Sequence, residues 1–232
     1  MSSRGQLFMN VDDAIVRTPW DAKCFGIDTY EIKLVSDEVL RRVSIVPGHY
    51  TAKVDPLFSK KLLHEYGFYY CDTLIEPYCA SPAFRSYEHD AVSVARNAAL
   101  DDLIMISHGA FSHGRFHRDF NISKDLADLR YDEWLKELFR QNKVLGLMYD
   151  GNPAGFFAFS ENRILLHALS ESLRGKGLSK YVWSAACKAM FDKGHKELVS
   201  SISVSNAAVL NLYASLGFKF RNPLDIYHRM IL

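Results

Sequence analysis

The sequence predicts an α/β (α+β) fold, with a central mixed, mostly antiparallel sheet flanked by helices and preceded by a smaller α/β domain. An apolar run at Ile164–Leu169 is followed by glycines and then by a helical pattern of apolar residues, which indicates strand, turn and helix. Asp150-Gly151 separates two further strand-like runs, as in a β-hairpin. Pro82 and its small neighbours interrupt the pattern, so we expect an N-terminal domain over residues 1–82 and a larger domain over residues 83–232.

Composition, charge and cysteine content are those of a globular protein without a nucleic-acid or membrane surface. The 232 residues are 48% hydrophobic and 24% charged, and the net charge is +1. We see no secretory signal and no run of about 18 apolar residues, so we expect a cytoplasmic protein. The four cysteines form no C-x-x-C pair, which favours reduced thiols.

In the N-terminal domain short strands surround one helix, and no residue pattern indicates chemistry of its own. Asp55-Pro56 is a typical helix start, and Gly67 is a typical helix end. The expected elements are strands over Thr29–Val35, Arg42–Val46, Tyr50–Val54 and Phe68–Pro77, and a helix over Leu57–Tyr66.

The larger domain combines helices with an antiparallel meander. Ser123 is the expected N-cap of a helix that ends at Gln141. The inward side of that helix should carry Leu126, Leu129, Trp134 and Leu138. Further expected elements are helices over 89–110 and 175–192, and strands over 144–149, 154–160, 164–169, 196–204, 218–220 and 226–231.

The turn Arg174-Gly175-Lys176-Gly177-Leu178-Ser179 joins a predicted strand to a predicted helix. Free backbone N–H groups and the positive end of the helix dipole meet at such a turn, which suits a phosphate or pyrophosphate. The turn is neither a P-loop, which needs Gly-Lys-Ser/Thr after a first glycine, nor a G-x-G-x-x-G dinucleotide turn. An anionic cofactor of another kind is therefore expected there.

A second informative segment is the helix that begins at Ser205 or Asn206 and ends at Gly217. Ser205 or Asn206 can cap its first turn, and a glycine is the usual left-handed residue after a helix. The apolar face carries residues spaced three or four apart, which are Val209, Leu212, Tyr213 and Leu216. Tyr213 is therefore expected on the buried face.

These two segments together resemble GCN5-related N-acetyltransferases. The turn resembles the family's Gln/Arg-x-x-Gly-x-Gly/Ala signature, with Ser179 in place of Gly or Ala, and the helix resembles Asn-x-x-Ala/Val-x-x-x-Tyr-x-x-x-Gly-Phe. The resemblance implies acetyl-CoA as the cofactor and Tyr213 as the acid that protonates the departing thiolate. It implies these contacts to coenzyme A: Leu169, Arg174, Gly175, Lys176, Gly177, Leu178, Ser179, Asn206 and Asn211.

Shorter matches look like the dTDP-fucosamine N-acetyltransferase group. They are Trp20–Gly26, the Leu57–Phe68 helix and Asp72-Thr73, together with residues 113–119, which resemble Ser-Arg-Phe-x-x-Asp with Gly114 in place of Ser. This likeness implies a nucleotide-sugar substrate, a dTDP-linked 4-amino-4,6-dideoxy sugar used for bacterial surface glycans, and makes the N-terminal domain a recognition domain. The substrate contacts would be Arg115, His117 and Asp119.

Direct attack of an amine on a thioester needs positioning, oxyanion stabilisation and proton transfer, but no covalent enzyme intermediate. His167 lies on the strand before the turn and is one possible base, and ordered water is the alternative. Simple alternation places His167 on one face with Leu165 and Leu169. No metal is expected, because His108, His113 and His117 lack a carboxylate or thiolate at zinc-site spacing.

Two other functions stay open. The same chemistry could act on a peptide N-terminus or a small amine, although the His/Arg-rich residues 113–118 disfavour a polyamine site. A non-catalytic acyl-CoA-binding protein is the alternative outside enzymes. An exposed C-terminal edge strand could also pair across a two-fold axis, which would give a homodimer.

Overall fold

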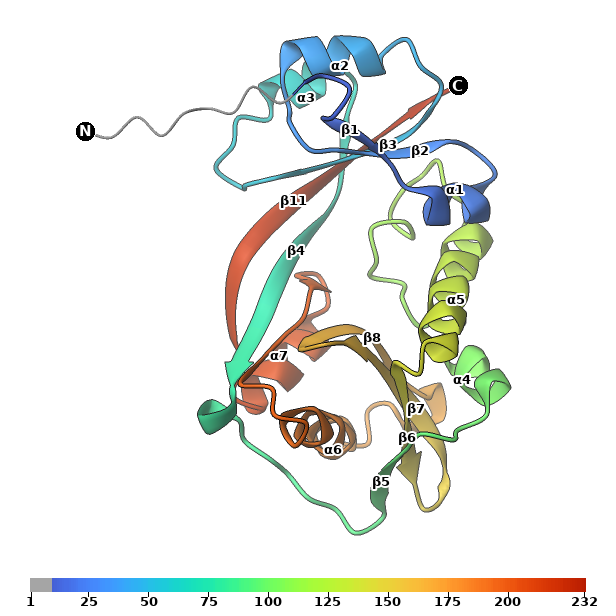
Figure 1. Ribbon diagram of the computed structural model, residues 1–232, viewed down its shortest axis with the longest axis vertical. Helices are drawn as coiled ribbons and strands as arrows, with labels where there is room; N and C mark the ends of the chain where they lie inside the picture. Colours follow the sequence, from blue (N-terminus) through green and yellow to red (C-terminus); the bar gives the residue numbers. More distant parts are fainter. Residues whose placement is uncertain (1–9) are drawn as a thin grey trace, which may run out of the picture. The chain divides into compact units, whose positions relative to one another are not determined.

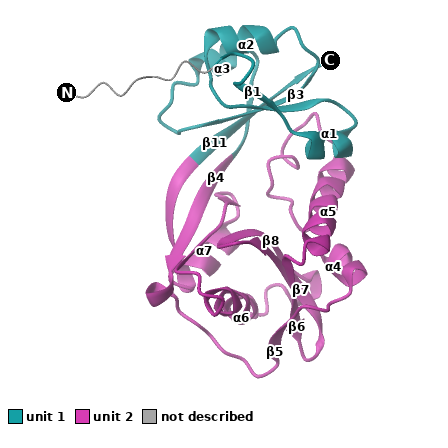
Figure 2. Ribbon diagram, in the orientation of Figure 1, with its two compact units in different colours: residues 1–72, 224–232 teal, residues 73–223 magenta. Residues whose placement is uncertain are grey.

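The computed structural model describes residues 10–232, which divide into two compact units (Figures 1 and 2). The first unit holds residues 10–72 together with Leu224–Leu232, and the second holds Thr73–Pro223. The boundary therefore lies ten residues before the expected one, and the chain returns to the first unit at its end. The cause is β4 (Tyr69–Ala80), whose later part pairs with strands of the second unit.

The first unit is a small sheet with short helices. Its strands follow the order β1, β2, β3, β11, in which β2 and β3 are parallel and the other pairs are antiparallel. The elements are β1 (Ile15–Arg17), α1 (Pro19–Phe25), β2 (Thr29–Ile32), α2 (Asp37–Val43), β3 (Gly48–Val54), α3 (Lys61–Glu65) and β11 (Lys219–Ile231).

Two expectations for this unit were wrong. The strand expected at Arg42–Val46 is instead the end of α2 and the turn that follows it. Ser36 caps that helix by accepting from the Val39 N–H, and Leu40 and Val43 are buried on one helical face. The helix expected over Leu57–Tyr66 is helical only within α3, since Asp55 accepts from the Leu57 N–H and closes a separate turn.

The second unit has a mixed, mostly antiparallel sheet flanked by helices, as expected. Its strand order is β4, β9, β8, β7, β6, β5, with β10 paired to β4. Helices α6 and α7 pack on one face around Trp183 and Met190, and α4 and α5 pack on the other around Leu103 and Leu135 (Figure 1). The elements are β5 (Val92–Ala95), α4 (Leu100–Ser107), α5 (Lys124–Arg140), β6 (Val144–Tyr149), β7 (Asn152–Ser160), β8 (Arg163–Leu169), α6 (Ser179–Phe191), β9 (Glu197–Val199), β10 (Ile202–Ser203) and α7 (Ala207–Ser215).

Strong local signals in this unit are confirmed. Asp150 and Gly151 adopt φ of 48° and 74°, as a two-residue hairpin turn requires. Ser123 caps α5 by accepting from the Leu126 N–H. Leu138 faces inward as expected, whereas the Leu129 side chain is 39% exposed.

Four segments of the expected larger domain differ from expectation. The helix expected over 89–110 begins only at Leu100, because Val92–Ala95 pairs with β6 as a strand. The helix expected from 175 begins at Ser179, after the glycine turn. The strand expected over 196–204 is broken into β9 and β10, and the last two expected strands form one continuous β11.

Residues Asp225–Ile231 of β11 pair with β3 over seven positions, so the expected edge has a partner within the chain, and the homodimer stays a prediction. Among the described residues, no helix is long and apolar enough to cross a membrane.

Candidate active site

The two parallel strands β8 and β9 separate almost as soon as they meet. They pair only at Arg163 and Val199, whereas β8 pairs with β7 along its whole length. Beyond Val199 the chain leaves β8, and β10 pairs with β4 instead. One side of β8 therefore presents backbone groups without a neighbouring strand, and such groups can hold an extended ligand and the oxygen of its acyl group.

A β-bulge lies on β8 beside this opening. Ala158 pairs with Leu166 but Phe159 pairs with Ile164, so Leu165 is an extra residue. The bulge shifts the alternation of side chains: His167 and Leu169 face α6 and α7, while Leu165 packs on the side of α4 and α5. The expectation that Leu165 shares a face with His167 was therefore wrong, because simple alternation ignores the extra residue.

The glycine turn follows β8 and leads into α6. Gly175 and Gly177 both have φ of 74°, a left-handed conformation that favours glycine, and no atom lies within 4 Å of the place where a Cβ would be. No side chain caps the first turn of α6, so its N–H groups remain available to an anion. Lys176 is exposed between the two glycines, whereas Leu178 is buried beneath the turn. The turn can hold a pyrophosphate through N–H groups, a helix dipole and a lysine.

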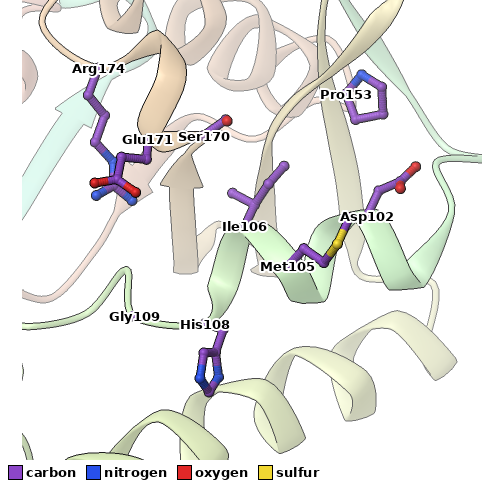
Figure 3. Close-up of a pocket in the computed structure, with 9 residues that line it drawn as sticks. All are labelled: Asp102, Met105, Ile106, His108, Gly109, Pro153, Ser170, Glu171 and Arg174. Atoms are coloured by element: carbon purple, nitrogen blue, oxygen red, sulfur yellow. The ribbon is translucent and has the colours of Figure 1, made fainter.

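Arg174 ties this turn to the end of β8. Its Nε donates to the Leu169 carbonyl at 3.0 Å, and the residue as a whole is exposed. Arg174 also lines a cavity of about 480 Å³ together with residues from the end of α4 and the start of β7 (Figure 3). The lining residues are Asp102, Met105, Ile106, His108, Gly109, Pro153, Ser170, Glu171 and Arg174.

Tyr213 and His167 meet on the α6 side of β8. The Tyr213 hydroxyl lies 3.0 Å from Nε2 of His167, and the Trp183 ring packs edge-on against the imidazole at 4.9 Å between centroids. Tyr213 is fully buried, and burial raises the pKa of its hydroxyl above the usual value. Burial also lowers the pKa of His167 to about 4. Both side chains are therefore neutral at pH 7.

This pairing bears on the expected role of each residue. A neutral Tyr213 keeps its proton until charge develops on a leaving group, as an acid should. A histidine with a pKa of about 4 accepts a proton from an amine only weakly, and its Nε2 already contacts Tyr213. The hydrogen bond suits His167 to orienting the tyrosine, and its role as the base stays a prediction.

The two asparagines expected at coenzyme A lie on or next to α7. Asn206 caps that helix, with its Oδ1 accepting from the Val209 N–H at 3.2 Å. Asn211 is exposed on the same helix. Neither residue lines the cavity beside Arg174, so their contacts with the cofactor stay predictions.

The expected substrate residues lie on the connection between α4 and α5. Nε2 of His117 lies 2.8 Å from Oδ1 of Asp128, and the guanidinium of Arg115 lies 4.6 Å from the centroid of the Phe116 ring. Asp119 is buried and accepts from the Asn121 N–H at 2.9 Å. These contacts order the connection, and none of the three expected residues lines the cavity.

A pair of residues at the cavity was not predicted from the sequence. His108 follows α4, and its Nδ1 lies 2.9 Å from Oδ2 of Asp132 on α5. The signal in the sequence was the spacing of two aspartates, since Asp128 and Asp132 lie one helical turn apart on α5. Asp128 contacts His117, and Asp132 contacts His108. Without the packing of α4 on α5, Asp132 resembles any charged residue of a solvated helix face.

Comparison with known proteins shows which family this part of the chain is similar to. The model of the acetyltransferase (GNAT) family matches residues 113–218, a range that includes the hairpin, the parted strands, the glycine turn and Tyr213. These residues are therefore similar to GNAT acetyltransferase domains. The family uses acetyl-CoA as its acyl donor.

Solved structures agree with the GNAT fold. A GCN5-related N-acetyltransferase from Sphaerobacter thermophilus has a TM-score of 0.57 at 11% identity, over 83% of this chain and 64% of that one. A functionally unknown conserved protein from Staphylococcus epidermidis has a TM-score of 0.65 at 11% identity, over 99% and 95%. The GCN5-related glucosamine N-acetyltransferase region of a fungal GH3 β-N-acetylglucosaminidase has a TM-score of 0.54 at 12% identity, over 78% and 25%. At sequence identities this low, the likeness shows the fold alone. A comparison with curated proteins found no match.

Proposed function

We propose that the protein transfers acetyl from acetyl-CoA to a primary amine by direct attack. The observation that carries this proposal is the junction at β8, where a strand parted from its neighbour runs directly into a glycine turn with an uncapped helix. An acyl-pantetheine arm along β8 would place its pyrophosphate at the turn. A non-catalytic acyl-CoA-binding protein would not need the buried Tyr213–His167 pair beside this strand, whereas an acetyltransferase can use it.

In the proposed reaction, β8 stabilises the oxyanion and Tyr213 supplies a proton. The amine nitrogen attacks the thioester carbonyl, and the oxyanion that forms is stabilised by backbone N–H groups of β8. The C–S bond then breaks, and the Tyr213 hydroxyl supplies the proton that the thiolate takes. Holding both substrates in line supplies the remaining rate acceleration.

For the acceptor, we propose a dTDP-linked 4-amino-4,6-dideoxy sugar. The support is the resemblance of the first unit and of residues 113–119 to the dTDP-fucosamine N-acetyltransferase group. The fungal region with a similar fold is described as a glucosamine N-acetyltransferase, so the fold is compatible with an amino sugar. Arg115, His117 and Asp119 are the proposed sugar-nucleotide contacts, and a peptide N-terminus or a small amine is the alternative acceptor.

A thiol-release assay with acetyl-CoA and a panel of amines tests both levels of the proposal. Release with dTDP-4-amino-4,6-dideoxy sugars, and not with peptides or simple amines, is the expected result. Release only with peptides or simple amines would remove the nucleotide sugar and keep the reaction. No release with any amine, while coenzyme A still binds by calorimetry, would remove the catalytic proposal.

Reversing the charge of Arg174 should weaken coenzyme A binding about 10- to 100-fold, because a charge-assisted hydrogen bond contributes roughly 1.5–3 kcal/mol. Calorimetry with coenzyme A measures this loss. Acetyl-pantetheine lacks the pyrophosphate, so its KM as the donor should change little in the Arg174→Glu variant.

The matched control is Arg140→Glu at the end of α5, where the arginine forms an exposed ion pair with Glu137. This control should bind coenzyme A as the wild type does. Equal losses for coenzyme A and for acetyl-pantetheine would overturn the assignment of the turn to the pyrophosphate.

A further inference from the structure

The cavity beside Arg174 has two acidic residues and a volume that suit a small amine. Its lining includes two acidic residues, Asp102 and Glu171, and two apolar residues of α4, Met105 and Ile106 (Figure 3). The Met105 side chain is 73% exposed, which is unusual for a large apolar residue and leaves it free to contact a ligand. A volume of about 480 Å³ falls within the usual range for small-molecule sites.

One imidazole lies among these lining residues, and its orientation is set by a buried carboxylate. Nδ1 of His108 lies 2.9 Å from Oδ2 of Asp132, whose side chain is only 9% exposed. The other oxygen of Asp132, Oδ1, is buried and has no hydrogen-bond partner among the described residues. His108 is thus the hydrogen-bonding partner of the Asp132 carboxylate, which lies on α5. A buried carboxylate strongly favours a nearby cation, so Asp132 favours the protonated form of the imidazole.

With Nδ1 held by Asp132, Nε2 is the ring nitrogen that can contact a ligand. The His108 side chain is 62% exposed, so the ring can exchange protons with an amine and with water. The hydrogen bond to Asp132, together with the charges of Asp132, Asp128 and Asp125 on α5, raises the pKa of His108 above its usual value. From the other elements around the cavity, Asp102 and Glu171 add negative charge and Arg174 adds positive charge.

We propose that this cavity receives the amine of the acceptor and that His108, oriented by Asp132, is the base that takes its proton. The inference rests on the proposed acetyl transfer. The nitrogen lone pair forms the C–N bond, and the C–S bond breaks when the resulting oxyanion collapses. The proton leaving nitrogen goes to Nε2 of His108, and the thiolate takes the Tyr213 proton. Exchange with water then returns one proton from His108 to Tyr213, so the enzyme ends each cycle unchanged.

His108 suits this task better than His167 does. The two residues differ in accessibility, since His167 lies within the core beside Trp183 whereas His108 lies at a cavity. They also differ in basicity, because burial lowers the pKa of His167 to about 4 while Asp132 raises that of His108. A base works best when its pKa lies near the working pH.

The competing explanation is structural. His108 directly follows α4, where a protonated imidazole stabilises the negative end of the helix dipole, and its bond to Asp132 joins α4 to α5. A purely structural pair changes the melting temperature when it is broken. It does not change the pH dependence of the reaction, and this difference separates the two roles.

The test is the pH profile of kcat/KM for the acceptor in the wild type, His108→Gln, Asp132→Asn and the control His195→Gln. In the wild type, kcat/KM should fall at low pH as His108 becomes protonated, and this fall is the acidic limb of the profile. We expect His108→Gln to lose about 10²- to 10⁴-fold in kcat/KM and to lose the acidic limb. In Asp132→Asn that limb should move to lower pH, because removing the carboxylate lowers the pKa of His108. His195 lies beyond α6 outside the cavity, so its variant should keep the wild-type profile.

Coenzyme A affinity, measured by calorimetry, shows that each variant is folded and should stay within about twofold of the wild type. If the wild type acetylates an amine and His108→Gln keeps both the wild-type rate and the acidic limb, the role of His108 is overturned while the proposed function stands. An unchanged limb in Asp132→Asn would remove the orienting role of Asp132. If the wild type acetylates no amine, the proposed function fails and this inference fails with it.

Discussion

Replacing Tyr213 with phenylalanine should lower kcat by about 10²- to 10⁴-fold while the affinity for coenzyme A changes little. The hydroxyl is the proposed proton donor to the leaving thiolate, and no other change in shape accompanies its removal. Because burial raises the pKa of Tyr213, this group stays protonated in the wild type up to at least pH 10. The wild-type rate should therefore show no alkaline decline caused by Tyr213 within the usual assay range. Steady-state kinetics and calorimetry with coenzyme A measure the two quantities.

Removing this hydroxyl also has a structural cost, which needs its own control. Nε2 of His167 loses its partner in the Tyr213→Phe variant, which should cost about 1–3 kcal/mol of stability. Tyr87→Phe removes a hydroxyl that donates to the Ser215 carbonyl at 3.3 Å and does not contact His167. The Tyr87 variant should lose some stability and keep its kcat. A Tyr213→Phe enzyme that is folded and fully active would exclude Tyr213 as the acid.

The parts of the site that sequence could predict are those with short-range causes. A pair of glycines between a strand and a helix implies the turn at Gly175 and Gly177, because few other residues adopt positive φ. The same reasoning predicts the hairpin at Asp150-Gly151 and the cap at Ser123. In each case the residue type acts on its own backbone or on the next turn of helix.

The parts that sequence could not predict depend on distant partners. Val92–Ala95 is a strand because β6 lies beside it, and nothing within the segment itself rules out a helix. The bulge at Leu165 arises from the register of β7 against β8 and reverses which side chains face α6. His108 and Asp132 are 24 positions apart in the chain, and only the packing of α4 on α5 brings them together.

The second large effect concerns Gly217, which ends the helix that carries Tyr213. It has φ of 89°, and a Cβ added there would lie 2.2 Å from the carbonyl oxygen of Ala83. The Gly217→Ala variant should therefore lose about 1–2 kcal/mol of stability through the left-handed conformation and about 1–3 kcal/mol through the clash with the backbone. A total of about 3 kcal/mol should lower the melting temperature by roughly 10 °C.

Gly194 provides the matched control, because it has φ of 94° after α6 and no atom lies within 4 Å of its added Cβ. The Gly194→Ala variant should lose only the conformational part, roughly 3 °C in melting temperature. The Phe218 N–H donates to the Tyr213 carbonyl at 3.0 Å, so a displaced Gly217 also disturbs the backbone at Tyr213. The Gly217 variant should therefore lose kcat as well as stability, whereas the Gly194 variant should lose stability alone. Equal melting temperatures for the two variants would show that the chain relieves the clash at Ala83 by a small shift.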